Sequence, residues 1–353
     1  MSDDDADSGA PVSGNVSAYF ADGLVEAVLD ELSIADLCTD VGRAGISAAS
    51  ELSEDEISAR TAAYEEAMRE AQERLVVSQD AEHLHISALL EVDPAKRIEL
   101  IKKALMSSRN DAFLAWDAVH ICTRVPDKGT CPVQEWEDQL LALDGQNSEA
   151  WIRVAANRLH RDDGEGALRA MQRAATSPVS RVYWTETIEA AVRSFAAAGD
   201  FSFLERASYG FGIAAANNPR YSDYTKMCRE EGAKNQEWAY ACLAYGELVE
   251  LQGKTILGQA IARTIQKIAL ESLEDDERLA TLAARKEKVR QGLDDLLRVS
   301  GGSRLETIGL SNPTIFYGFL TVMSNDGEMA AQVYLQNETE RWLHQRQDLE
   351  CTP

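Results

Sequence analysis

The stretch "GELVELQGKTILGQAI", residues 246–261, contains a Gly-Lys-Thr triplet of the kind that ends a phosphate-binding loop. Such a loop needs a glycine, four residues and then Gly-Lys-Thr, so that consecutive backbone N–H groups can wrap the phosphates. Gly246 and Gly253 are separated by six residues, and the intervening "ELVELQ" has a helical pattern. We therefore expect no nucleotide site here. The stretch instead predicts a turn in which Gly253 ends one helix and Thr255 caps the next.

The histidines do not form a recognisable metal site. His83 and His85 are two residues apart. On a helix this spacing turns them roughly 200° from each other, whereas a zinc-binding helix uses a spacing of four. We expect this pair to lie at the rim or in the core of the fold. The other histidines, His120, His160 and His344, are isolated in the sequence. The sequence also has no Gly-x-Ser-x-Gly motif, which would mark a catalytic serine. We predict no catalytic, metal or cofactor site.

Four of the six cysteines fall into two local pairs, Cys122 with Cys131 and Cys228 with Cys242. Neither spacing is the Cys-x-x-Cys of zinc ribbons and redox sites. Each pair would close a short loop, and a disulfide there would stabilise the fold by roughly 2.5–3 kcal/mol. The alternative is that these residues are small buried apolar side chains in a reduced protein. Both interpretations are open at the level of sequence.

The redox state of the cysteines bears on the compartment. Paired cysteines would indicate a periplasmic or secreted protein, and reduced ones a cytoplasmic protein. Cys38 and Cys351 are far apart in the sequence, so they are either free or tie the two ends together. The N-terminal "MSDDDADSGAPVSGN" has no basic or apolar signal region, so no secretory signal is visible. Two explanations are open: the protein is cytosolic, or its signal peptide was removed and replaced by Met1. Residues 1–16 are expected to form a disordered acidic tail.

The charge balance narrows the range of partners. The chain has 35 basic and 59 acidic residues, a formal net charge of −24. Such a surface repels nucleic acid and anionic lipid headgroups, so we expect no nucleic-acid partner, whereas basic partners are favoured. No run approaches the roughly 18–20 apolar residues that span a bilayer, so no membrane span is predicted.

Nearly every segment has the apolar spacing of an amphipathic helix. In residues 53–75, for example, apolar side chains recur at steps of seven, four, three and four and share one helical face: Ile57, Tyr64, Met68, Ala71 and Leu75. Sustained period-two alternation and Asn-Gly or Asp-Gly hairpins are absent from the sequence. The sequence therefore predicts an all-α fold.

The segment "SEAWIRVAANRLHRDDGEGALRAMQRAATSP", residues 148–178, resembles a tetratricopeptide repeat, whose unit is a pair of antiparallel helices. Trp151 supplies the large aromatic early in the first helix, and Val154-Ala155 stands in place of the family's Leu-Gly pair. Arg158 stands where the family has Tyr, and the interhelix Gly164 is displaced by two positions. The second-helix positions and the closing proline, one residue early, are filled by Ala167, Met171, Ala174 and Pro178.

Three neighbouring segments, residues 81–108, 110–147 and 182–207, repeat this pattern. Trp184 lies 33 residues after Trp151, close to the family's period, and a Gly-Asp-Phe turn follows at residues 199–201. The resemblance thus covers residues 78–212 in four units. It implies an α-solenoid of stacked antiparallel helix pairs. Residues 17–77 are expected to be N-terminal helices, and residues 213–353 a helical region that continues or caps the solenoid.

A solenoid of this kind has a concave face built largely from the first helix of each pair. The positions that the resemblance places on this candidate partner-facing groove are mostly apolar: Leu114, Ala118, Ile121, Ile152, Ala156, Leu159 and His160. Two alternatives follow. Either the groove takes an apolar segment of a partner, or the chain's own C-terminal helices fill it.

The C-terminal region offers an element that could cover the array. Pro313 lies near the start of a predicted helix. Apolar side chains then recur on one face of this helix: Phe316, Phe319, Leu320 and Met323. We expect this stripe to dock on the repeats.

These observations favour a non-enzymatic helical-repeat scaffold that binds a protein or peptide partner without a cofactor. The alternative is a structural or envelope-associated protein stapled by disulfides, in which the repeats provide a stable body. A more remote alternative is an enzyme whose site is assembled between helices, because groups distant in sequence meet only in the fold.

Overall fold

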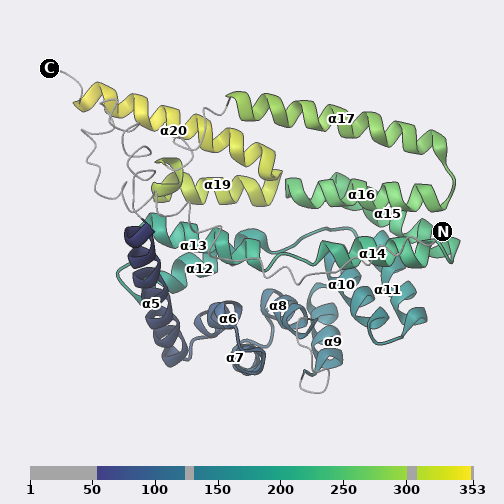
Figure 1. Ribbon diagram of the computed structural model, residues 1–353, viewed down its shortest axis with the longest axis horizontal. Coiled ribbons are helices and arrows are strands. Elements are labelled where there is room, and N and C mark those ends of the chain that lie inside the picture. The colour runs from purple at the N-terminus through teal and green to yellow at the C-terminus, as the bar shows by residue number, and fades with distance from the viewer. Residues whose placement is uncertain (1–53, 124–130, 300–307, 351–353) are drawn as a thin grey trace. The chain divides into compact units, whose positions relative to one another are not determined.

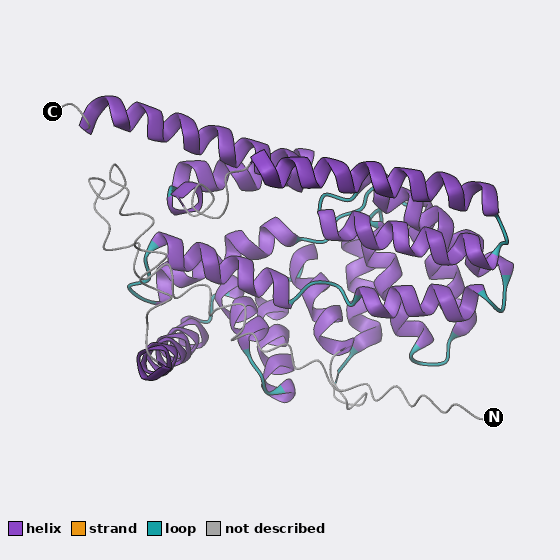
Figure 2. Ribbon diagram, turned by 45° about the horizontal axis from the view of Figure 1, so that its top comes forward, coloured by secondary structure: helices purple, strands orange, loops and turns teal. Residues whose placement is uncertain are grey.

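The computed structural model describes residues 54–123, 131–299 and 308–350, and these form fifteen helices (Figures 1 and 2). The chain divides into two units, Met1–Tyr64 and Glu65–Pro353, and apart from residues 54–64 the structure described below belongs to the second. The prediction of an all-α fold is confirmed for the described residues. The predicted tail at residues 1–16, most of the predicted N-terminal helices, Cys38 and Cys351 lie outside them. Helix α5 covers Glu54–Ser78.

Pairs of consecutive helices joined by short connections dominate the packing. The helices that pair in this way within the predicted repeats are α6 (Ala81–Leu90) with α7 (Pro94–Ser107), α8 (Ala112–Thr123) with α9 (Val133–Asp144), α10 (Ser148–Leu159) with α11 (Gly164–Thr176), and α12 (Trp184–Ala198) with α13 (Phe203–Ala216). The four predicted units therefore correspond to four helix pairs.

The C-terminal part of the chain is also helical. Helices α14 and α15 pack on each other and on α16, α17 packs on α16, and α19 pairs with α20 (Figure 1). Their bounds are α14 (Tyr221–Gly232), α15 (Gln236–Gln252), α16 (Ile256–Ser272), α17 (Asp276–Val299), α19 (Pro313–Asp326) and α20 (Glu328–Glu350).

Local sequence sets where these helices begin. Asx side chains accept hydrogen bonds from first-turn N–H groups at several starts, and Ser202 forms a capping box with Glu205 at the start of α13. Pro313 occupies the first position of α19, as predicted, because a proline there lacks only an N–H that the helix would leave unpaired. The Asx caps include Asp80, Asp93, Asn147, Asn235 and Asn312.

The pairs do not pack simply in chain order. The α10/α11 pair packs against α8 and α9 on one side and against α14 and α15 on the other, whereas α12 packs against α6 and α19. The connection from residue 177 to 183 explains this change. Val179 forms an isolated bridge with Asn147, and Tyr183 adopts a left-handed conformation with φ of 56° directly before α12. The chain thus runs past the start of α10 and turns toward α6.

Among the described residues, two apolar cores join helices that are far apart in the sequence. One joins α10 and α11 to α14, α15 and α16, with Leu282 of α17 at its edge. The other joins α12 and α13 to α19 and α20. Phe316, Phe319, Leu320 and Met323 lie in this second core, so the prediction that their stripe docks on the repeats is confirmed. None of the described helices combines the length and apolarity needed to cross a bilayer.

Gly246, the first residue of the stretch that resembles a phosphate loop, lies at a close approach of α15 to α16. A Cβ atom there would lie 2.8 Å from the carbonyl oxygen of Ala262 and 2.8 Å from Cγ of Gln266. The backbones of the two helices can meet only because this position has no side chain. Gly292 on α17, by contrast, faces open space.

Alanine substitutions at these two glycines should therefore have opposite effects on stability. Gly292→Ala should raise the free energy of unfolding by up to about 1 kcal/mol, because alanine is the better helix former. Gly246→Ala should lower it by about 1–3 kcal/mol, because the methyl group collides with backbone. Urea denaturation followed by circular dichroism measures both. Equal shifts in the two variants would show that the helices do not meet at Gly246.

Candidate functional site

Most residues of the predicted groove lie inside the protein. Leu114, Ala118, Ile121, Ile152 and Ala156 are each at most 7% exposed. Leu159 is half-buried, and His160 at the end of α10 is exposed. The five buried side chains therefore lie within the fold of the described residues.

The C-terminal helices cover the part of this face that belongs to α10. Ile152 and Ala156 share a core with Tyr224 of α14 and with Trp238 and Tyr245 of α15. At α10, residues of the predicted groove therefore share a core with the C-terminal helices α14 and α15, whereas the solenoid that would form the groove stays a prediction.

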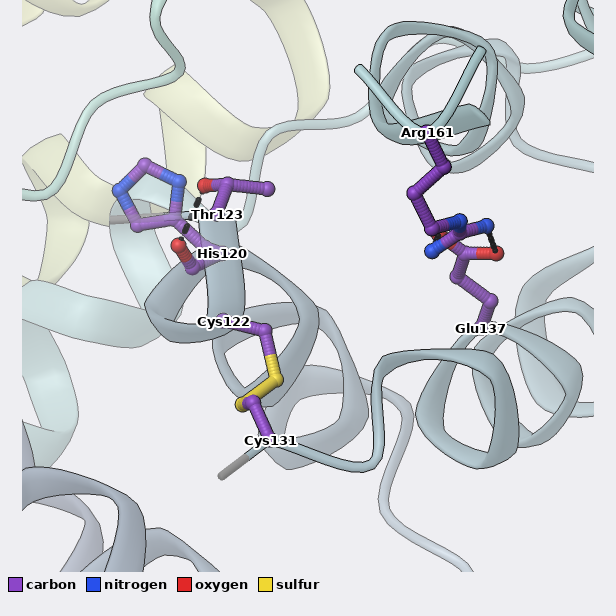
Figure 3. Close-up of a disulfide and its surroundings, with 6 residues drawn as sticks. All are labelled: His120, Cys122, Thr123, Cys131, Glu137 and Arg161. Atoms are coloured by element: carbon purple, nitrogen blue, oxygen red, sulfur yellow. Dashed lines mark hydrogen bonds and ion pairs between the residues drawn. A yellow bond between two sulfur atoms is a disulfide. The ribbon is translucent and has the colours of Figure 1, made fainter. Parts of the chain in front are cut away.

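The four locally paired cysteines lie at disulfide distance. Cys122 at the end of α8 bonds Cys131, with Cα atoms 5.7 Å apart (Figure 3). Cys228 of α14 bonds Cys242 of α15, with Cα atoms 5.8 Å apart, and both of these residues are fully buried. Both pairs thus have the Cα separation of a disulfide. The second bridge ties together two helices of the larger core.

A buried ion pair lies near the first bridge. Glu137 of α9 is 0% exposed, and both of its carboxylate oxygens accept hydrogen bonds from Arg161, at 3.0 and 2.7 Å (Figure 3). This pair joins α9 to the turn that follows α10. Removal of one partner would be costly, because it would leave the other charge without compensation.

A buried polar stripe on α10 was not predicted from the sequence. Glu149, Arg153 and Asn157 are spaced four residues apart, so they lie on one face of the helix, and each is at most 4% exposed. The signal was present in the sequence, since the other residues of α10 between positions 150 and 156 are all apolar. Polar residues that recur every four positions in such a helix indicate a buried network.

Glu149 connects three parts of the chain. Its Oε1 accepts hydrogen bonds from the hydroxyl of Tyr245, at 2.8 Å, and from the hydroxyl of Ser180, at 3.3 Å. Its Oε2 has no hydrogen bond among the described residues. Burial raises the pKa of Glu149, against the opposing effects of the two hydroxyls and of Arg153.

Arg153 extends the network to α8. Its Nη1 donates to the carbonyl oxygen of Trp116 at 3.0 Å, and its guanidinium lies 3.6 Å from the centre of the Trp116 ring. Burial raises the pKa values of Tyr221 and Tyr224, which lie near these charges. The hydroxyl groups of both tyrosines therefore stay protonated beside these charges.

The two nearby histidines have separate environments. His85 is 1% exposed, and its Nε2 lies 2.8 Å from the Asp117 carboxylate of α8. His83 is half-buried, and its Nδ1 forms a hydrogen bond with the hydroxyl of Ser78 at 2.7 Å. The expectation of a rim or core pair is confirmed, with one residue in each place. Among the described residues, no three His, Cys, Asp or Glu side chains are grouped as metal ligands would be.

The Gly-Lys-Thr stretch forms the predicted turn. The N–H of Gly253 bonds Val249 at the end of α15, and the hydroxyl of Thr255 accepts from Gly258 N–H at 3.0 Å at the start of α16. A second acceptor comes from α20, because Oε2 of Glu328 lies 2.7 Å from the N–H of Ile256. A carboxylate therefore already sits at this helix start, where a phosphate loop would place a phosphate.

A half-enclosed hollow of about 190 Å³ lies between the pairs α12/α13 and α19/α20. Three of its lining residues are aromatic, and two are polar. Sequence analysis singled out Trp184, Phe319 and Met323 for packing, but it did not predict that they line a hollow with Glu328. We name this site the aromatic hollow; its lining residues are Trp184, Phe211, Leu310, Phe319, Met323, Glu328 and Gln332.

Comparison with known proteins gives no relative from which a function could be transferred. No family model matches the chain, and no curated protein matches it significantly. The resemblance to tetratricopeptide repeats therefore rests on the residues of the four units alone.

Replacement of Glu149 by glutamine should change how stability depends on pH. The raised pKa means that the folded protein holds this proton at pH values where the unfolded chain has released it. The stabilising effect is complete below the unfolded-state value of about 4.5 and is lost as the pH rises through the folded-state pKa. In this window wild-type protein should lose up to about 1.4 kcal/mol per pH unit relative to Glu149→Gln.

Urea denaturation of both proteins between about pH 5 and 8 measures this difference. Glu340→Gln on the exposed face of α20 is the matched control, because it replaces a carboxyl group by an amide at an exposed position instead of a buried one. Its stability profile should run parallel to that of the wild type. A parallel profile for Glu149→Gln as well would contradict the predicted role of burial.

Proposed function

We propose that the protein is a non-enzymatic helical scaffold that binds a protein or peptide partner, and that the aromatic hollow anchors this partner. The support for the proposal is the hollow itself. It opens between two helix pairs, and its side chains Trp184 and Phe211 are only half-buried. An aromatic side chain left partly exposed at a concave site is a common anchor point in protein recognition.

The location of the hollow is consistent with the burial of the predicted groove. Because the C-terminal helices cover the α10 face, a partner needs another surface. The α12/α13 pair and the α19/α20 pair come from distant parts of the sequence, so a segment bound across them would contact both. The net charge of −24 favours a basic partner.

Selection of binding peptides from a displayed library tests this function. Selected peptides should bind the wild-type protein with a Kd near the micromolar range, which corresponds to about 8 kcal/mol. Trp184→Glu should weaken binding at least tenfold, because it places a charge in the apolar part of the hollow. Fluorescence anisotropy of labelled peptides measures the affinities.

The matched control for this experiment is Tyr240→Glu. Tyr240 on α15 is 57% exposed and is not among the lining residues of the hollow. This variant should bind the selected peptides as the wild type does. Equal binding by Trp184→Glu, with its circular dichroism spectrum unchanged, would show that the hollow is not the anchor.

A second candidate function is the disulfide-stapled structural or envelope-associated protein. The observation that favours it is the pair of bridges, Cys122–Cys131 and Cys228–Cys242. Bridges of this kind persist in oxidising compartments. Under this candidate the helical body would be the functional product, and the periplasm or the cell exterior would be its location.

Alkylation of cysteines in denatured protein tests this candidate. Without reductant, four cysteines should be protected, and all six should react after reduction. In the native protein, a mild reductant should open Cys122–Cys131 first, because Cys131 is partly exposed and Cys228–Cys242 is fully buried. Mass spectrometry counts the labels. Six reactive thiols without reductant would exclude the stapled protein.

A further inference from the structure

We propose that the aromatic hollow recognises an organic cation, an ammonium or guanidinium group carried on an apolar stem. The cation could be the side chain of a lysine or arginine in a partner polypeptide, or a free quaternary ammonium compound. In its polypeptide form, this inference rests on the proposed function and names the anchor that the partner supplies.

The aromatic residues supply the first part of the argument. Trp184, Phe211 and Phe319 come from three helices and line the same small volume. The face of an aromatic ring carries partial negative charge, so several rings around one volume attract a cation and accommodate its methyl or methylene groups. Neutral apolar ligands would also pack against such rings. A further feature is therefore needed to favour a cation over a neutral ligand.

Glu328 supplies that feature. It lines the hollow, and one carboxylate oxygen is held by the N–H of Ile256 at 2.7 Å, which fixes the orientation of the group. Its side chain forms no ion pair within 4.0 Å among the described residues. Burial raises the pKa of Glu328 against the opposing effect of the Ile256 N–H, because desolvation penalises the charged form of the carboxylate. A cation that enters the hollow would pair with the carboxylate and favour this charged form.

Lys254 is a positively charged residue whose backbone contacts Glu328, and its amine bonds another group. Its Nζ donates to the carbonyl oxygen of Asn325 at 2.6 Å, while its own carbonyl accepts from the N–H of Glu328 at 2.7 Å. The contact therefore joins the backbones of Lys254 and Glu328, and the Lys254 amine bonds Asn325 rather than the Glu328 carboxylate. The positive charge of Lys254 should weaken the binding of a second cation nearby.

Isothermal titration calorimetry of the full-length protein tests the inference with choline and with its neutral isostere 3,3-dimethylbutanol. Peptides that contain one lysine or arginine, and the same peptides with norleucine in its place, form the polypeptide arm. We expect the charged member of at least one arm to bind at least tenfold more tightly than its neutral counterpart. Binding only in the first arm assigns a small-molecule ligand, and binding only in the second assigns a polypeptide.

Three variants connect this binding to the hollow. Glu328→Gln keeps an acceptor for the N–H of Ile256 but removes the charge, and it should weaken cation binding about tenfold. Trp184→Leu keeps apolar volume without the ring face and should weaken it about threefold. Lys254→Met should tighten it about twofold. Glu340→Gln, on the exposed face of the same helix as Glu328, should leave it unchanged.

Equal affinity for charged and neutral members in both arms would overturn the inference. So would unchanged cation binding by Glu328→Gln. Either result would leave the proposed function standing, provided that library peptides still distinguish wild-type protein from Trp184→Glu. Loss of that distinction, with choline binding retained, would overturn the scaffold function and leave a small-molecule site.

Discussion

The burial of α10 on all sides constrains the rest of the described structure. Nine of its twelve residues are buried, including Glu149 and Arg153. A helix in this position needs partners around its whole circumference, and α8, α9, α11 and α14 supply them. The polar stripe then determines how these partners are oriented, because Arg153 must reach the carbonyl of Trp116 while Glu149 meets the hydroxyl of Tyr245.

Sequence patterns predicted where the helices lie in the chain better than they predicted which helices pack against each other. Apolar spacing and caps located the helix pairs, and the loop spacing at Gly253 and Thr255 located a turn rather than a phosphate site. The order of packing depends on contacts across the chain, such as the bridge between Asn147 and Val179 and the left-handed Tyr183. No local pattern encodes such contacts, so the return of α12 to α6 could not be predicted.

The candidate site also depends on contacts between distant parts of the chain, which local sequence patterns do not show. Sequence analysis named Trp184 and Phe319 but not Phe211, and the aromatic hollow exists only because two distant helix pairs meet. Glu328 was overlooked because an acidic residue at a helix start is usually explained by the helix dipole alone. In the fold it reaches across to Ile256, the start of a helix 72 residues earlier in the chain. The function of such a residue depends on its tertiary partner and is absent from its local sequence.

This long-range cap has a consequence for biosynthesis. A chain emerging from the ribosome exposes the α12/α13 pair and the beginning of α16 well before residues 313–350 are made. Until then, the apolar face of α12 lacks the stripe from α19, and the first turn of α16 lacks its carboxylate. The larger core, by contrast, contains no described residue beyond Leu282. The segment around residues 184–216 should therefore be the part most dependent on chaperones or on rapid completion of translation.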